Sequence, residues 1–155
     1  MDDLLRQLLQ EEQELQFTNF NEAAAWQIGC HLVERGRGEG LAITIDITRG
    51  THQLFHASLS GTSPDNDEWI KRKVRLVYRF GHSSFYMGQL LKSKGKRIEE
   101  AYLISENEYS PHGGCFPVIV KGTGVIGTIT VSGLPQEDDH QLVVGAIRNY
   151  LAQEQ

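Results

Sequence analysis

The stretch Val125-Ile-Gly-Thr-Ile-Thr-Val-Ser-Gly-Leu-Pro-Gln-Glu-Asp-Asp-His140 decides the fold of this 155-residue chain more than any other part of it. Its β-branched residues continue to Val131 and predict a buried strand. A Gly-Leu-Pro break follows, and the three acidic residues after it are typical of the first turn of a helix. This last helix is predicted to start at Pro135, with a packed face that recurs every four residues at Val143, Ile147 and Leu151.

Two antiparallel hairpins are predicted on the same kind of evidence. The strand at 125–131 pairs with one at 116–120 through a glycine-containing turn at 121–124. Earlier in the chain, apolar and polar residues alternate from Leu41 to Thr48, which is the period of a half-buried strand. Arg49-Gly50 is suited to a tight turn into a second strand at 51–59.

Helical patterns occupy the first part of the chain. A broad stripe of leucines predicts an amphipathic N-terminal helix at about 2–16. Asn21 is a suitable N-cap for a second helix, which ends in the glycine-rich segment 35–40.

A third helical region lies between the hairpins. Ser63 and Pro64 are suited to the cap and first position of a helix that ends near Gly81, and a further turn or helix follows at 83–91. The third helix is expected to bury Ile70, Val74 and Val77. The order helix, hairpin, helices, hairpin, helix predicts one α+β domain over residues 1–155, with an antiparallel sheet covered by helices.

Composition restricts the class of protein. The net charge of −5 argues against general nucleic-acid binding and against a polybasic membrane anchor. The start of the chain is acidic and amphipathic rather than a signal peptide, and no apolar run reaches the roughly 20 residues of a membrane helix. Cys30 and Cys115 are two isolated cysteines, which fits a reducing compartment. We therefore expect a cytoplasmic protein with no nucleic-acid or membrane partner.

Three motifs carry a resemblance: Phe80-Gly-His-Ser-Ser84, His112-Gly-Gly-Cys-Phe-Pro117 and Val131-Ser-Gly-Leu-Pro-Gln-Glu-Asp-Asp-His-Gln-Leu142. With them the chain resembles uncharacterised protein family 0303, a branch of the haem-degrading-domain (GlcG/HbpS-like) group, from about the second helix to the C-terminus. The resemblance implies a profilin-like, three-layer α/β/α fold with a five-stranded antiparallel sheet, and ring-like or stacked homo-oligomers. Four strands are evident in the sequence, and the fifth is expected between Ala101 and Ile104.

A row of cations is the first candidate binding feature. Lys71, Arg75 and Arg79 are four residues apart, so they share one stripe of the third helix. Such a stripe can attract carboxylates, including haem propionates or a small organic acid. The alternative is an ordinary solvated face, with the later cations favoured by the negative end of the helix.

Two short loops complete the candidate site. His82 and Ser83 follow the end of the third helix, where an imidazole and backbone donors can converge on a ligand or can simply brace the break. In the loop His112-Gly113-Gly114, the glycines allow backbone amides to approach a bound group. Haem needs only one axial side chain, and His82, His112 or His31 can each supply it.

Several other features favour structural roles. Cys115 is a nucleophile only if a basic neighbour lowers its pKa, and a buried cysteine is usually inert. His52 and His56 lie roughly 13 Å apart on a strand, too far for one ion, so no metal site is expected. The acidic residues of the last helix are interpreted as capping and dipole features, and His140 as part of its polar end.

The leading hypothesis is a cytoplasmic, homo-oligomeric domain that binds a small anionic ligand, with haem as one candidate cofactor. Its candidate ligand-binding residues are Arg75, Arg79, His82, Ser83, His112, Gly113 and Gly114. One alternative is a haem-degrading or other small-molecule enzyme at the same place, although the sequence identifies no catalytic residue. Another is a non-catalytic structural or protein-interaction assembly.

Overall fold

The computed structural model describes residues 2–154. Within these residues five strands form one sheet in the order β1-β4-β5-β2-β3. β1 runs parallel to β4, and the other neighbouring strands are antiparallel. The strands are β1 (Gln16–Phe17), β2 (Thr44–Arg49), β3 (His52–Ser58), β4 (Cys115–Val120) and β5 (Gly124–Ser132). Both predicted hairpins, β2–β3 and β4–β5, are confirmed.

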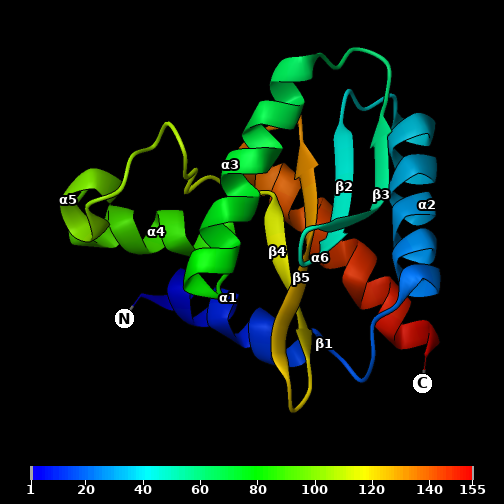
Figure 1. Ribbon diagram of the computed structural model, residues 1–155, viewed down its shortest axis with the longest axis horizontal. Helices are drawn as coiled ribbons and strands as arrows, with labels where there is room; N and C mark the ends of the chain where they lie inside the picture. Colours follow the sequence, from blue (N-terminus) through cyan, green and yellow to red (C-terminus); the bar gives the residue numbers. More distant parts are fainter. Residues whose placement is uncertain (1, 155) are drawn as a thin grey trace.

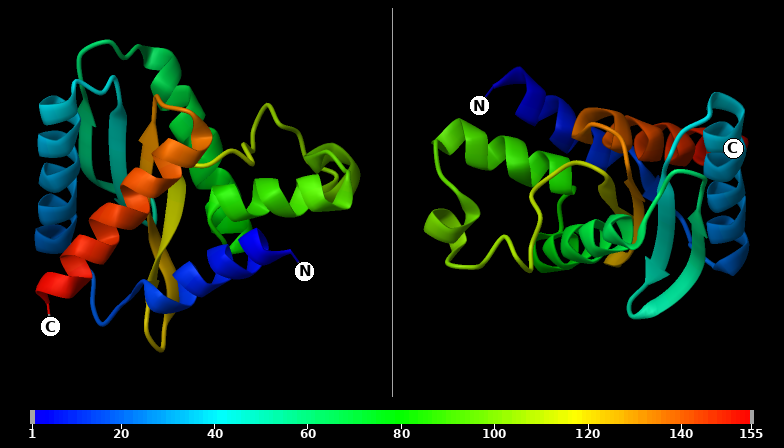
Figure 2. Two further views of the ribbon diagram at one scale, coloured as in Figure 1. Left: turned by 180° about the vertical axis from the view of Figure 1, so that it is seen from behind. Right: turned by 90° about the horizontal axis from the view of Figure 1, so that it is seen from above.

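Helices cover the sheet on both sides and give the three layers expected of the fold class (Figures 1 and 2). Helices α2 (Glu22–Glu39) and α6 (Gln136–Gln153) pack on one face, and α3 (Pro64–Phe80) packs on the other. The main hydrophobic core lies between the sheet and the α2–α6 layer, where the strands contribute Ile45, Ile47, Phe116, Val118, Ile129 and Val131.

The sheet face beneath α3 is polar although it is buried. β5 places Thr128, Thr130 and Ser132 there, in alternation with its core residues. From β2, Thr44 and Asp46 are equally buried. The prediction that β2 is half-buried was therefore wrong, because α3 covers the polar side that the alternation assigns to solvent. Polar residues on a covered face need partners, and this face leads to the candidate site.

The helix boundaries follow local chemistry as expected. The Asn21 side chain accepts a hydrogen bond from the Ala24 amide at 2.9 Å, and Pro64 is the first residue of α3. The Ser63 amide donates to the Asn66 side chain at 2.9 Å. Gly81 ends α3 with a φ of 73°, a conformation that glycine adopts without strain. Pro135 is the cap of α6, and the helix begins one residue later.

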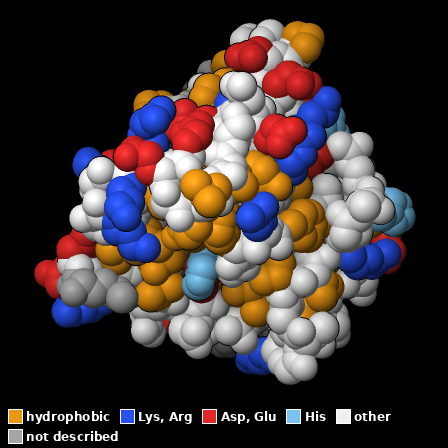
Figure 3. Space-filling view, turned by 60° about the vertical axis from the view of Figure 1, so that its left-hand side comes forward, with side chains coloured by type: hydrophobic (Ala, Val, Ile, Leu, Met, Phe, Trp, Pro, Cys, Tyr) orange, Lys and Arg blue, Asp and Glu red, His pale blue; other side chains and the backbone are white. Residues whose placement is uncertain are grey.

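A second group of helices extends beyond the β1–β4 edge of the sheet (Figure 1). It consists of α1 (Asp3–Glu14), α4 (Ser84–Lys94) and α5 (Ile98–Tyr102), which enclose a smaller hydrophobic cluster with Leu5, Leu8 and Leu91. Figure 3 shows hydrophobic side chains gathered on this side of the molecule. No helix among residues 2–154 combines the length and apolar character needed to cross a membrane.

The fifth strand is not where it was expected. Residues 101–104 form the end of α5 and the turn after it, in which Leu103 has a φ of 58°. The fifth strand is instead β1, directly after α1. A two-residue strand is too short to show the alternation by which strands are recognised, and its parallel pairing gives no hairpin signal.

Candidate functional site

A pocket of about 420 Å³ lies beside the N-terminal half of α3. We call it the α3 pocket. Its wall is formed by α3, by the loop before β4 and by the segment that joins β5 to α6. Its lining residues are Asp65, Asn66, Trp69, Lys73, His112, Gly113, Ser132, Gly133, Leu134, Gln136 and Asp139. Its size is within the range of small-molecule sites, roughly 300–1,000 Å³.

The two most buried charged residues of the pocket face each other. The side chains of Lys73 and Asp139 are 4% and 2% exposed, and Nζ lies 3.5 Å from Oδ2. Lys73 also donates to the Val131 carbonyl at 3.4 Å. Asp139 accepts the amides of Gly133 at 3.3 Å and Leu134 at 3.0 Å, and so fixes the turn between β5 and α6. The pair thus joins α3, β5 and α6 at the pocket.

Burial shifts the pKa values of Lys73 and Asp139 in opposite directions. It lowers the pKa of Lys73, because the ammonium loses its hydration. It raises the pKa of Asp139 to about 6, against the opposing effects of Lys73 and of two backbone amides. Opposite shifts of this kind bring the two pKa values closer together, and perturbed pKa values are common at functional sites.

His112 and its glycines form the outer wall. Burial lowers the pKa of His112, so its imidazole is neutral at pH 7. The ring packs against the edge of Trp69, with centroids 5.7 Å apart, and the Arg72 guanidinium lies 4.0 Å over the indole. The Gly113 amide donates to Gln136 Oε1 at 3.0 Å.

Gly114 is required by the close packing of the pocket. It has a φ of 136°, and a Cβ on it would collide with the Val131 carbonyl oxygen and lie 2.8 Å from Lys73 Nζ. Only glycine fits both the backbone conformation and the space. The sequence suggested that the glycines of this loop expose backbone amides to a ligand. In the structure Gly114 also leaves the space that Lys73 Nζ needs.

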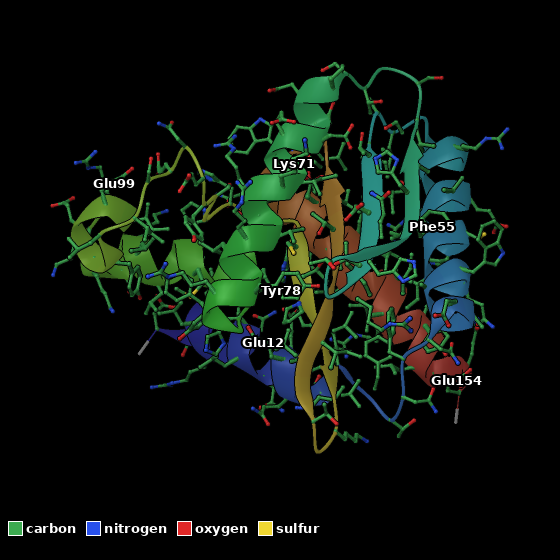
Figure 4. All side chains as sticks on the ribbon, in the orientation of Figure 1. Glu12, Phe55, Lys71, Tyr78, Glu99 and Glu154 are labelled. Carbon is green, nitrogen blue, oxygen red and sulfur yellow. The ribbon has the colours of Figure 1, made fainter. Side chains whose placement is uncertain are left out.

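The sequence-predicted residues separate into two groups. His112 and Gly113 line the α3 pocket and Gly114 lies directly behind it, whereas Arg75, Arg79, His82 and Ser83 do not line it. Arg75 donates to the Glu108 carbonyl at 3.3 Å, and Arg79 lies over the rings of Phe80 and Tyr109. Lys71, the third cation of the stripe, pairs with Glu68 at 2.8 Å on the outside of α3 (Figure 4).

His82 and Ser83 contact α1 instead. His82 Nδ1 lies 2.7 Å from Glu12 Oε1, and the Ser83 amide donates to Glu12 Oε2 at 3.2 Å. The hydrogen bond to Glu12 raises the pKa of His82. This geometry corresponds to the bracing alternative, in which His82 supports the break between α3 and α4.

Lys73 and Asp139 were not among the sequence-predicted residues. The sequence pattern predicts Val74 on the buried face of α3 and therefore leaves Lys73 outside that face. In the structure the buried residues of α3 are Ile70, Lys73, Leu76 and Val77. The spacing was the available signal, because a residue three positions after the buried Ile70 lies on the same face of the helix. Asp139 does stabilise the turn before α6, but its pairing with Lys73 depends on tertiary structure.

His140 corrects a further interpretation. It is fully buried rather than part of a polar helix end, and its Nε2 lies 3.0 Å from Oε1 of the buried Glu11. Its partner is more than a hundred residues away in sequence. A local pattern therefore gave no indication of it.

The cysteines are both free. Cys115 is completely buried, and burial raises the pKa of its thiol to about 12 although Lys73 acts in the opposite direction. A thiol in this state is not a nucleophile at neutral pH. Residues 2–154 contain no group of three or more His, Cys, Asp or Glu side chains arranged to hold a metal ion.

The fold is that of an α+β domain in which a sheet lies between helix layers and a pocket lies beside the end of the central strand β5. A family model described as haem degrading protein HbpS-like matches residues 20–148, and the chain belongs to this HbpS-like family. The predicted family 0303 relationship is confirmed. A UPF0303 protein of Rhizobium etli is 46% identical over 99% of this chain and 93% of its own length. One from Streptomyces coelicolor is 45% identical over 95% and 93%.

Solved structures agree with this fold. The Ybr137w protein is 31% identical, with a TM-score of 0.89 over 97% of this chain and 88% of that one. HbpS (19% identical, TM-score 0.65, 88% and 92% covered) and the PduOC:heme complex (16%, 0.68, 83% and 93%) are more distant and share the fold.

Proposed function

We propose that this chain is a single-domain binder of a small anionic organic molecule, held in the α3 pocket. The observation that carries the proposal is the buried Lys73–Asp139 pair at the pocket. Removing two charges from water is costly, and their Nζ–Oδ2 separation of 3.5 Å is long for a pair that repays this cost by itself. A ligand carboxylate near Lys73 would add the charge-assisted contact that the pair lacks.

Haem is the specific ligand that we consider first. A neutral, half-buried His112 can offer one axial nitrogen, and Lys73 can offer a cation for a propionate, so the donors present fit the group. The haem complex of PduOC, a protein of the same fold, supports this choice. Bound haem would supply redox chemistry, which is the basis of the alternative that the chain is a haem-degrading enzyme, as the family description suggests.

We further propose that the domain acts as a homo-oligomer in the cytoplasm. Free Cys30 and Cys115 are consistent with a reducing compartment. Large apolar side chains at the surface, such as Leu103 at 87% exposure, favour burial against another copy. If assembly were the whole function, the α3 pocket would bind no small molecule.

A histidine panel tests the ligand proposal. Haem is titrated into the wild type and into His112→Ala, His82→Ala and His31→Ala, and the Soret absorbance is followed. His112→Ala is expected to weaken binding at least tenfold, because it removes the axial nitrogen at the pocket. His31→Ala is the control on α2. Saturable binding that depends on His82 alone would move the site to the α1–α4 contact, and absence of binding would exclude haem.

Turnover separates a binder from an enzyme. Haem-loaded protein is mixed with a reductant in air, and the Soret band and reaction products are followed over time. If the protein only binds haem, its Soret absorbance should fall no faster than that of free haem. If the protein is an enzyme, the absorbance should fall faster than that of free haem. The same assay on His112→Ala shows whether any degradation occurs at the α3 pocket.

A further inference from the structure

Lys73 differs from an ordinary surface lysine in its surroundings. Its side chain is 4% exposed, whereas that of Lys71, two residues earlier, is 61% exposed. An ammonium has three donors, and the two contacts of Lys73 are at 3.4 and 3.5 Å, the long end of hydrogen bonding. Its amine is therefore buried, weakly held and at the wall of a pocket that admits a small molecule.

A purely structural lysine would be expected to look different. Lysines that tie elements together form short bonds to carboxylates or carbonyls, typically at 2.7–2.9 Å for charged pairs. Lys73 instead occupies space made available by Gly114, whose missing Cβ would lie 2.8 Å from Nζ. Gly114 thus has a backbone conformation that other residues rarely adopt, and it lies beside an amine that makes no short contact. This combination favours a chemical role for the Lys73 amine.

We propose that Lys73 is a nucleophile that forms an imine with a small aldehyde or ketone bound in the α3 pocket. This inference rests on the proposed function, because it requires the pocket to admit a small molecule. The substrate class is a small carbonyl compound, because the pocket has a volume of about 420 Å³ and its lining combines the polar residues Asn66 and Ser132 with the apolar indole of Trp69.

Asp139 provides the proton transfers that the step requires. The Lys73 ammonium gives one proton to the Asp139 carboxylate, and the amine lone pair then attacks the carbonyl carbon. Asp139 returns this proton to the carbonyl oxygen and accepts one from the attached nitrogen, which gives a neutral carbinolamine. Asp139 then passes that second proton to the hydroxyl, which leaves as water while the nitrogen lone pair forms the C=N bond of a protonated imine. The products are one C=N bond and one water molecule, with no oxidant or reductant. The lowered pKa of Lys73 and the raised pKa of Asp139 both favour the first transfer.

Borohydride trapping tests the inference on the full-length protein. Glyoxylate and glycolaldehyde are the probes, because both are small aldehydes and only the first carries a carboxylate. Each is incubated with the native protein, the imine is reduced with cyanoborohydride, and the modified lysine is identified by peptide mass spectrometry. We expect Lys73 to be modified at least tenfold faster than Lys71. Faster reaction with glyoxylate would show that the pocket selects an anionic carbonyl compound, and equal rates that it selects the carbonyl alone.

Three controls accompany the trapping experiment. Lys73→Arg keeps the charge and cannot form the imine, so its adduct should be lost, whereas Lys71→Arg should react like the wild type. In urea the preference for Lys73 should disappear. If the native Lys73 peptide stays unmodified while exposed lysines react, the inference is wrong whether or not Lys73→Arg folds. Glyoxylate binding is measured separately by calorimetry without reductant, so binding without an adduct would leave the proposed function standing and overturn only the nucleophile.

Discussion

Burial raises the pKa of Asp139 from 3.8 to about 6, which gives stability a pH dependence opposite to that of an ordinary acidic ion-pair partner. Between these two values the folded protein binds a proton that the unfolded chain has released, so stability falls as pH rises. Above about pH 6 both states are ionised and the loss is complete. At 1.36 kcal/mol per pKa unit, the loss is on the order of 2–3 kcal/mol.

Asp139→Asn removes this titration and is the matched comparison. Urea unfolding of the wild type and of Asp139→Asn at pH 4, 5, 6 and 7 gives the difference in their unfolding free energies. Relative to the variant, the wild type should lose stability from pH 4 to 6 and change little from 6 to 7. If the unfolding free energy of the wild type instead rises relative to that of Asp139→Asn from pH 4 to 6, Lys73 keeps the Asp139 carboxylate ionised.

Gly114 allows a second prediction at the scale of a residue. Gly114→Ala combines a φ of 136° with a collision against the Val131 carbonyl, so it should destabilise the protein by about 3 kcal/mol or more. Gly122→Ala is the control, because Gly122 also has a positive φ, of 79°, but a Cβ there meets open space. It should cost only about 1 kcal/mol. Equal unfolding midpoints for the two variants would mean that the pocket loop can shift freely.

At the scale of the element, α1 is held by buried carboxylates as well as by its leucines. Glu12→Gln should weaken the bonds to His82 and Ser83 and destabilise the protein by about 1.5–3 kcal/mol at pH 6. Because Glu12 raises the pKa of His82, the stabilisation is fully present below pH 6.5 and is lost as pH rises through the folded pKa. The effect of Glu12→Gln should therefore be smaller at pH 9 than at pH 6.

Glu14→Gln on the same helix is the control. Glu14 is about half exposed and contacts Arg148 at 3.3 Å, so its loss should destabilise the protein much less than the loss of Glu12. Both variants are compared by urea unfolding at the two pH values. Equal effects of the two substitutions would indicate that α1 is held by apolar contacts alone.

The contrast between α3 and β1 shows what sequence can predict here. The ends of α3 follow from Ser63, Pro64 and Gly81, because caps and turns are local chemistry. β1 was missed because two residues carry no periodicity. Its position depends on pairing with β4 a hundred residues later.

The site divides in the same way. The loop of His112 and Gly113 was visible as a motif and does line the α3 pocket. Lys73 and Asp139 were not, since their pairing depends on how α3 and α6 pack against the sheet. Arg75 and Arg79 looked like ligand-binding cations in sequence because charge spacing does not reveal that carbonyls and aromatic rings already surround them.

At the scale of the whole molecule, the apolar surface is unevenly placed. Hydrophobic side chains gather on the side of α4 and α5 (Figure 3), where Leu103 is 87% exposed and has a φ of 58°. A bulky residue with both features is costly in a free monomer. Trp26, 64% exposed, lies on α2 at the opposite end of the molecule (Figure 1). We expect the α4–α5 side to be the self-association surface.

Light scattering with size-exclusion chromatography tests this surface at micromolar concentration. The wild type should have a mass that is a multiple of 17.4 kDa. Leu103→Glu should shift it towards one chain, because the new carboxylate would be desolvated in the interface. Trp26→Glu adds the same charge at the other end and should leave the mass unchanged. The reverse response would place the interface on α2, and a wild-type mass of 17.4 kDa would rule out self-association under these conditions.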